Sequence, residues 1–188
     1  MGFKGTLAQQ MAPRIGELAP GLTTTFVREA LNRAIVGVGP LAPAALAAEK
    51  QLKEQRGDVD RAIHEVIENN VRLAGAQGFA MNLGGVVTAA VAIPANVAGL
   101  AIIECRMAAG IAHLRGHDLA EPRVRSAVMA LLLGEDKVNE LIKQRKLPGT
   151  PMELATTAHH DATLDGAIAS IVANTFMARM TGKRLAST

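Results

Sequence analysis

The sequence contains no tryptophan and no tyrosine, and only four of its 188 residues are phenylalanine. Membrane-spanning proteins usually carry Trp and Tyr at the two membrane–water interfaces, so this absence argues against a permanent span. Proteins that bind single-stranded nucleic acids usually stack the bases on aromatic side chains. The composition therefore disfavours a nucleic-acid partner as well.

Cysteine is nearly absent too. The single Cys105 excludes an internal disulfide and fits a reducing compartment. The amino-terminal residues lack the apolar run of a signal peptide, because Gln9 and Gln10 interrupt it. With 49% hydrophobic residues and a net charge of +3, the chain is apolar enough to bury a core and only mildly basic. We expect a cytoplasmic protein, and a peripheral position on the cytoplasmic face of the membrane falls within that expectation.

Charged residues are missing from one long stretch, Leu73 to Ile103, although 20% of the whole chain is charged. These 31 residues exceed the roughly 20 that a transmembrane helix needs. Gly and Ala outnumber Leu and Phe in the stretch, and Pro94 breaks its helical pattern. Small side chains recur at every fourth position, which lets a second helix approach closely: Ala76, Ala80, Gly84, Thr88 and Ala92. The stretch predicts a Gly/Ala-rich apolar helical hairpin that turns near Pro94.

The rest of the chain predicts an all-α helical bundle built around this hairpin, because apolar residues recur with helical spacing and nowhere alternate as in a strand. Helices are expected at Phe26 to Ile35, Pro43 to Gly57, Asp58 into the charge-free stretch, Pro94 to Gly116, Pro122 to Leu132, Glu135 to Lys146 and Leu164 to Met180. The third of these should turn one face inward: Val59, Ile63, Val66, Ile67 and Val71.

The expected helix ends follow from capping residues. A Thr run at 23–25 should cap the first helix and Asp58 the third. Either Asp161 or Thr163 should cap the last helix, and Thr150 with Glu153 should form a capping box. We expect a single domain over 1–188, in which residues 1–22 are a weakly ordered lead, 23–146 the core and 147–188 a linker (LPGTP) followed by an amphipathic helix.

Two histidine patterns have a spacing that is compatible with metal binding. His64 and Glu68 lie one turn apart, as in half of an H-E-x-x-H zinc motif, but Glu replaces the second histidine. A solvated His–Glu pair is the simpler interpretation, with a metal site as the alternative. His113 and His117 have the same spacing, but Gly116 should end the helix and rotate His117 away.

The remaining candidate reactive groups give equally little indication of a functional site. His159 and His160 are adjacent and would point to different sides of a helix. Cys105 continues a face of small residues and is expected to be a buried small hydrophobe, although Arg106 beside it could lower a thiol pKa. The glycines form no phosphate-binding loop, since no lysine follows Gly84-Gly85. We therefore predict no catalytic residue, no cofactor and no metal.

Four segments together resemble the EcsC family of bacterial proteins. They are ALNRAIVGVGPL (30–41), AGAQGFAMNLGG (74–85), VAIPANVAGLAIIECRMAAGIAHLRGHDL (91–119) and PRVRSAVMALLLG (122–134). The chain departs from the family pattern after residue 146, where LPGTP and one amphipathic helix stand in place of a longer Gly-rich segment. The resemblance implies a bacterial helical protein associated with membranes, and it supplies no catalytic residues.

These observations favour a protein that is not an enzyme and that associates with membranes or binds an apolar ligand through the hairpin. Its apolar contact residues would be Phe79, Met81, Leu83, Val87, Val91, Val97, Leu100 and Ile103. The residues facing anionic headgroups would be Arg106, Arg115, Arg123 and Arg125. One alternative is a soluble homo-oligomeric scaffold with the hairpin as buried core. Another is a metal-dependent enzyme, which would need His64, His113 or His159 to converge.

Overall fold

The computed structural model of the chain describes residues 20–75 and 95–185. These residues form eight α-helices and no strand, so the expected all-α class is confirmed. The helices are α1 (Pro20–Val36), α2 (Ala44–Glu54), α3 (Val59–Gly75), α5 (Ala95–Leu114), α6 (Pro122–Leu131), α7 (Glu135–Lys143), α8 (Pro151–Thr156) and α9 (Ala162–Leu185).

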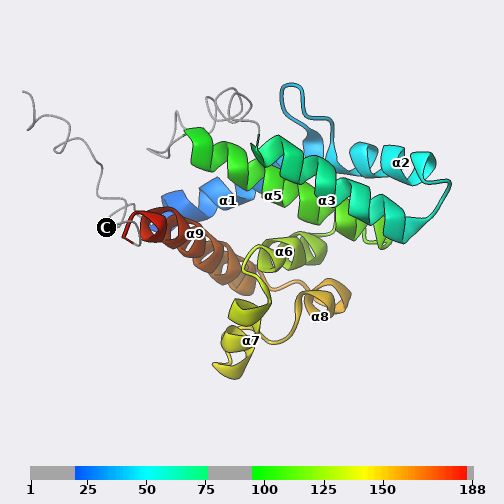
Figure 1. The fold of residues 1–188 in the computed structure, drawn as a ribbon. Coiled ribbons are helices and arrows are strands. Elements are labelled where there is room, and N and C mark those ends of the chain that lie inside the picture. Colours follow the sequence, from blue (N-terminus) through cyan, green and yellow to red (C-terminus); the bar gives the residue numbers. More distant parts are fainter. Residues whose placement is uncertain (1–19, 76–94, 186–188) are drawn as a thin grey trace, which may run out of the picture.

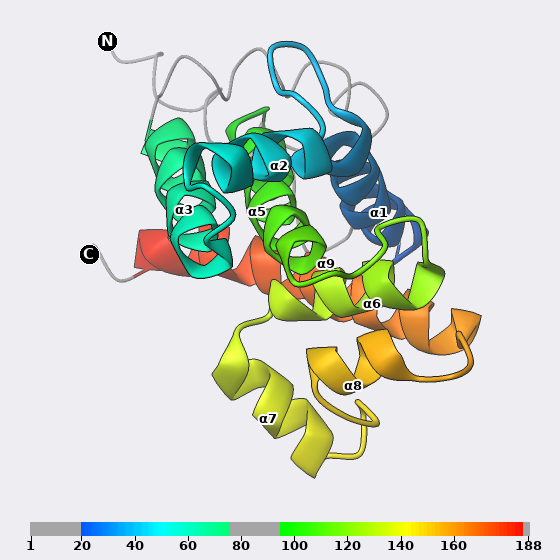
Figure 2. The same cartoon turned by 90° about the vertical axis from the view of Figure 1, so that its right-hand side faces the viewer.

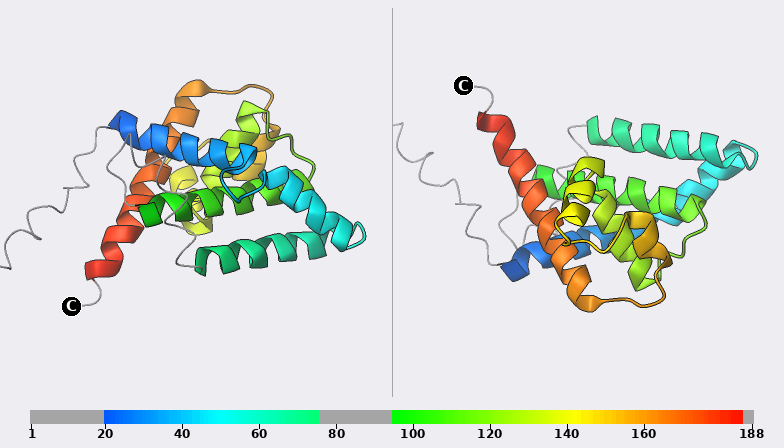
Figure 3. Two further views of the ribbon diagram at one scale, coloured as in Figure 1. Left: turned by 90° about the horizontal axis from the view of Figure 1, so that it is seen from above. Right: turned by 90° about the horizontal axis from the view of Figure 1, so that it is seen from below.

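The helices are arranged in two groups (Figures 1 and 2). In the first group α1, α5 and α3 lie side by side, with α5 in the middle, and α2 packs against α3 and α5 (Figure 3, left). In the second group α6 contacts α7, α8 and α9. Helix α9 crosses α1 at a steep angle and connects the two groups (Figure 3).

Helix α5 forms the centre of the fold because it carries almost no polar surface. Its twenty residues, ANVAGLAIIECRMAAGIAHL, contain only Glu104 and Arg106 as side chains that are normally charged. An apolar helix of this kind must be covered on most of its circumference. Its buried small and medium side chains lie in the core: Val97, Ala98, Ala101, Ile102, Cys105, Ala109 and Ala112. Cys105 is thus a buried small hydrophobe, as expected.

Most helix ends lie where the capping residues predict them. The Asp58 side chain accepts a bond from the N–H of Arg61 at 3.0 Å at the start of α3. Gly116 adopts φ +84° after α5, which lets the chain reverse. The predicted capping box of Thr150 and Glu153 opens α8, and the Asp161 carboxylate accepts from the backbone of Thr163 at 2.8 Å.

The structure corrects three boundaries. Helix α1 begins at Pro20, three residues before the Thr run, because proline suits the first turn of a helix. The LPGTP segment is not an open linker, since Leu147 is buried in the main core and Pro151 already belongs to α8. Helix α9 continues to Leu185, beyond the expected end at Met180. The division of the chain into lead, core and tail stays a prediction.

The predicted hairpin lies largely outside the described residues, which resume at Ala95. A close helix contact of the expected kind is nevertheless present further along, at Gly110 of α5. A Cβ at this position would lie 3.3 Å from Val66 Cγ1 of α3 and 3.6 Å from the Ala48 Cβ of α2. Gly110 therefore allows α2 and α3 to approach α5 closely.

Substituting Gly110 by leucine should destabilise the protein by about 1–3 kcal/mol, because the added side chain overpacks the junction of three helices. Gly166 of α9 is the matched control, since a Cβ there would meet only the tip of Arg28 at 3.8 Å. Gly166→Ala should leave stability unchanged or raise it by up to about 1 kcal/mol through helix propensity. Chemical denaturation of both variants tests the contact, and an unchanged midpoint for Gly110→Leu would contradict it.

The capping box makes the stability of α8 depend on pH. Bonds from the Thr150 backbone N–H at 2.6 Å, and then from its hydroxyl, hold the pKa of Glu153 below its ordinary value. A lowered carboxyl pKa contributes stability above the unfolded-state pKa, and this contribution is lost as the pH falls through the folded-state value. Thr150→Ala should cost about 1 kcal/mol at neutral pH. Glu153→Gln should lower the melting temperature at pH 7 but not in acid, where the wild-type carboxylate is itself protonated.

Candidate functional site

An apolar groove runs along one face of α5. It lies between α3 and the junction of α6 with α7, and it encloses about 530 Å³. We call it the α5 groove and define it by six apolar residues: Val71, Leu100, Ile103, Met107, Ile111 and Leu131. Asn70 and Glu104 also line it. This size lies within the range of small-molecule sites.

A second hollow of about 330 Å³ continues the groove towards the carboxyl end of α5. The two share Ile111 and Leu131 as lining residues, so they are contiguous. The second hollow lies among α5, α6 and α8, and its lining is apolar apart from Arg115, His117 and Thr150. Together these two adjacent hollows, which we call the channel, extend from Leu100 to Arg115, about 22 Å along the helix axis at 1.5 Å per residue.

Three of the six large apolar residues that are exposed in the described chain line this channel. Val71 of α3 is 60% exposed and Leu131 of α6 is 47% exposed, and Met152 beside the second hollow is 58% exposed. The helical periodicity predicts that Ile67 and Val71 face inward, but both are exposed. The prediction is wrong for these two because α3 buries a narrower face, Ala62, Val66 and Asn70, against its neighbours.

Only three of the predicted apolar contact residues fall within the described chain. Leu100 and Ile103 line the α5 groove, whereas Val97 is buried in the core. The others lie outside the described residues: Phe79, Met81, Leu83, Val87 and Val91, together with the helix-packing residues Ala76, Ala80, Gly84, Thr88 and Ala92. These remain predictions.

The expectation that Arg106 faces lipid headgroups is wrong, because its side chain is turned into the protein. Arg106 is only 9% exposed. Its Nε donates to the carbonyl oxygen of Ala42 and its Nη1 to Oδ1 of Asn70, both at 3.1 Å. Burial lowers the pKa of the guanidinium from its ordinary value. Arginine titrates so far above neutrality that the group remains charged.

The other three predicted arginines lie nearer the surface, and each has a partner within the protein. Arg115 pairs with Asp60 at 2.9 Å. Arg123 donates to the carbonyl of Thr157 at 2.9 Å, and its Nε lies 3.4 Å from the Glu121 carboxylate without a hydrogen bond. Arg125 donates to the side chain of Asn32 at 3.1 Å. All three retain partial exposure.

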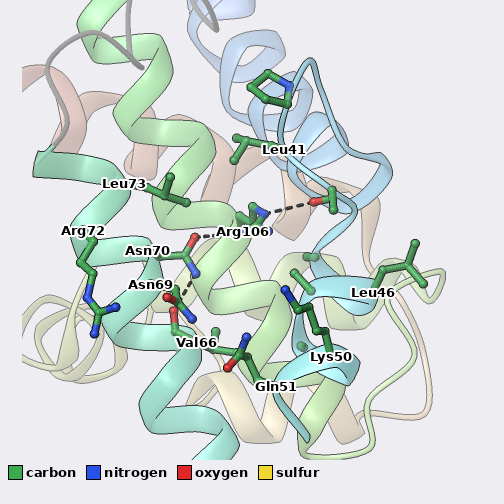
Figure 4. A pocket seen from close by; sticks show the side chains of 15 residues that line it. Leu41, Leu46, Lys50, Gln51, Val66, Asn69, Asn70, Arg72, Leu73 and Arg106 are labelled. Carbon is green, nitrogen blue, oxygen red and sulfur yellow. Dashed lines mark hydrogen bonds between the residues drawn. The ribbon is translucent and has the colours of Figure 1, made fainter. Parts of the chain in front are cut away.

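Arg106 lies at the wall of another hollow (Figure 4), whose lining has only Asn70 in common with the α5 groove. This hollow encloses about 540 Å³ among α2, α3, α5 and the loop before α2. Its polar lining residues are Lys50, Gln51, Asn69, Asn70, Arg72 and Arg106, and the rest are mainly Ala, Leu and Val. Sequence reasoning missed this set, since its members come from three segments far apart in the chain.

The histidines do not converge. His64 pairs with Glu68 at 3.1 Å, as the simpler interpretation predicted, and His113 pairs with Glu49 of α2 at 3.0 Å. His159 and His160 are exposed. Within the described ranges no three His, Cys, Asp or Glu side chains are placed to hold a metal. Burial, and then the neighbouring Glu104, raises the pKa of the Cys105 thiol, which disfavours its reactive thiolate form.

A second feature that sequence reasoning missed is a polar junction of α1, α6 and α9. The Asp165 carboxylate accepts a bond from the hydroxyl of Ser126 at 2.7 Å and pairs with the guanidinium of Arg28. Ser126 donates directly to the carboxylate, so the arrangement lacks the intervening base that activates a serine nucleophile. The junction therefore holds helices together.

One helix of the described chain, Val97–Leu114 within α5, is long and apolar enough to cross a membrane. However, 67% of it is buried inside the protein, and the core helix of a protein folded in water passes the same test. This is weak support for a span.

Comparison of the chain with models of known protein families, with curated proteins and with solved structures found no match. The resemblance to the EcsC family therefore stays a prediction, and the functional argument rests on the geometry of the hollows.

Removing the Asp165 carboxylate should destabilise the protein, because the buried Ser126 hydroxyl keeps only its longer 3.2 Å bond to the carbonyl of Pro122 while Arg28 loses its ion pair. Asp165→Ala should cost about 1–3 kcal/mol. Asp60→Ala is the matched control, since it breaks an ion pair in which both side chains are at least half exposed, worth at most about 1 kcal/mol. Equal denaturation midpoints for the two variants would show that the junction contributes no more to stability than an exposed ion pair does.

Proposed function

We propose that the protein is a non-enzymatic helical protein that binds lipid at an anionic membrane surface, with a lipid acyl chain lying in the α5 groove. The observation that carries the proposal is the groove itself. Helix α5 is apolar apart from Glu104, Arg106 and His113, and the described helices leave one of its faces open between α3 and α6. The apolar lining and exposed rims suit a chain of methylene groups better than a polar substrate.

The energetics of such binding favour burial of the rim residues. Each square ångström of apolar surface removed from water stabilises the bound state by about 25 cal/mol. Val71 and Leu131 are exposed on opposite sides of the groove, so a single acyl chain would cover both. Arg115 and His117 lie where the channel ends, and this position suits the anionic end of a lipid. Because Arg115 already pairs with Asp60, its attraction to a headgroup should be modest.

The second candidate is a soluble homo-oligomer in which another copy of the chain covers the same apolar residues. The same exposed rim, Val71, Leu131 and Met152, favours this candidate, since contiguous exposed apolar surface is typical of interfaces. We favour lipid because two mainly apolar hollows lie one after the other along α5. Membership of the EcsC family, which the sequence segments support, fits the same proposal.

The protein should float with vesicles that contain anionic phosphatidylglycerol at low salt, and binding should weaken as salt is raised because exposed charges are screened. The double variant Val71→Ser, Leu131→Ser should lose binding at every salt concentration. The double variant Val36→Ser, Leu46→Ser is the matched control. Both residues are exposed, at 65% and 59%, and neither lines the α5 groove.

Two further measurements distinguish the candidates. Circular dichroism should show that both double variants remain helical, and light scattering should give the same mass for each as for the wild type. If the groove variant instead changes from an oligomer to a monomer and the wild type ignores all vesicles, the scaffold is the better account. If both variants bind vesicles equally, the α5 groove has no part in lipid binding.

A further inference from the structure

The hollow beside Arg106 has a chemistry different from that of the α5 groove. Arg106 projects from an apolar helix into the space among α2, α3 and α5 (Figure 4). Removing a cation from water is costly unless a carboxylate or several acceptors compensate for the loss. Within the described part of the chain no Asp or Glu lies within ion-pairing distance of Arg106. Its two bonded partners are a neutral carbonyl and a neutral amide.

These two partners fix the guanidinium in one position. The carbonyl of Ala42 holds Nε, and Asn70 holds Nη1. Asn70 is itself buried and is oriented by a 2.7 Å bond from its Nδ2 to the carbonyl of Val66. A guanidinium has five N–H hydrogens, and only these two bonds are made by Arg106 within the described ranges. The guanidinium is therefore held in a fixed position, while its other N–H groups, on Nη1 and Nη2, make no bond within the described residues.

The rest of the lining adds two positively charged residues, Lys50 and Arg72, and no negatively charged one. Lys50 of α2 lines the same hollow, and the one ion pair it makes within the described residues, with Glu54, is long at 3.8 Å. Arg72 also borders the hollow, but its guanidinium bonds Glu68 and points away from Arg106 and Lys50 (Figure 4). The remaining walls are largely apolar, including Leu41, Leu46 and Leu73.

We propose that this hollow is a binding site for a small organic carboxylate with an apolar body, whose carboxylate accepts bonds from Arg106 and is attracted by Lys50. The planar guanidinium matches a carboxylate better than a lysine would, because two parallel N–H groups can meet its two oxygens. The apolar walls and the volume of about 540 Å³ suit a short hydrocarbon body. The site is separate from the α5 groove and does not depend on lipid binding there.

The test uses octanoate as the probe and octanamide, its neutral counterpart, as the reference, in titration calorimetry of the full chain. Octanoate should bind one per chain, at least about tenfold more tightly than octanamide, because the charged head contributes a charge-assisted bond. Asn70→Asp should weaken octanoate binding at least about tenfold, since it places a carboxylate against Arg106 and so competes with the ligand. Thermal melting monitors the fold of this variant, which loses the bond to Val66.

Two surface variants separate a local effect from a change in net charge. Lys50→Gln and Arg72→Gln each remove one positive charge, but only Lys50 is directed at the proposed ligand. Lys50→Gln should weaken octanoate binding about threefold or more, while Arg72→Gln should change it less than about twofold. The proposal is overturned if the wild type prefers octanamide or binds neither probe. It is also overturned if Lys50→Gln and Arg72→Gln behave alike, or if inorganic phosphate binds as tightly as octanoate.

Discussion

The structure depends on the need to cover α5. A twenty-residue helix with an almost wholly apolar surface cannot stand free in water, so the helices around it must bury it from several sides. Helices α1, α2, α3 and α6 all contact α5, and its small residues let them approach closely, most clearly at Gly110. Within the described residues these helices leave parts of α5 uncovered, and the hollows lie at those places. The same constraint thus generates the core and both candidate sites.

Arg106 shows how one polar residue on such a helix is accommodated. Its position is buried, yet no carboxylate compensates it within the described residues, and two neutral oxygens from different segments hold it instead. Because these oxygens belong to the loop before α2 and to α3, the guanidinium links three parts of the fold. A buried cation satisfied only by neutral groups retains most of its attraction for an anion. This is the physical basis for distinguishing its hollow from the purely apolar groove.

Local patterns in the sequence predict most helix ends correctly. Contacts between segments that are far apart in the chain could not be predicted from it. The capping box at Thr150, the stop at Gly116 and the burial of Cys105 each follow from neighbouring residues, and all three are confirmed. The exposure of Val71 and Leu131 could not be predicted, because periodicity gives a face but not how much of that face a partner covers. The Arg106 hollow was missed for a related reason: Ala42, Asn70 and Arg106 are brought together only by tertiary packing.

The two hollows share one wall, and this decides how their roles can be separated. Asn70 lines both, while its neighbour Val71 faces only the α5 groove and Lys50 only the Arg106 hollow. A substitution at Asn70 therefore changes the lining of both hollows, and its effect on octanoate is assigned to the Arg106 hollow by the Lys50 variant. Residues on the outer walls can make that assignment, because Leu131 belongs to α6 and Lys50 to α2, and no direct bond joins these two helices in the described chain. Independent effects at Leu131 and Lys50 would mean that α3 separates two sites, whereas coupled effects would mean that it transmits the occupancy of one to the other.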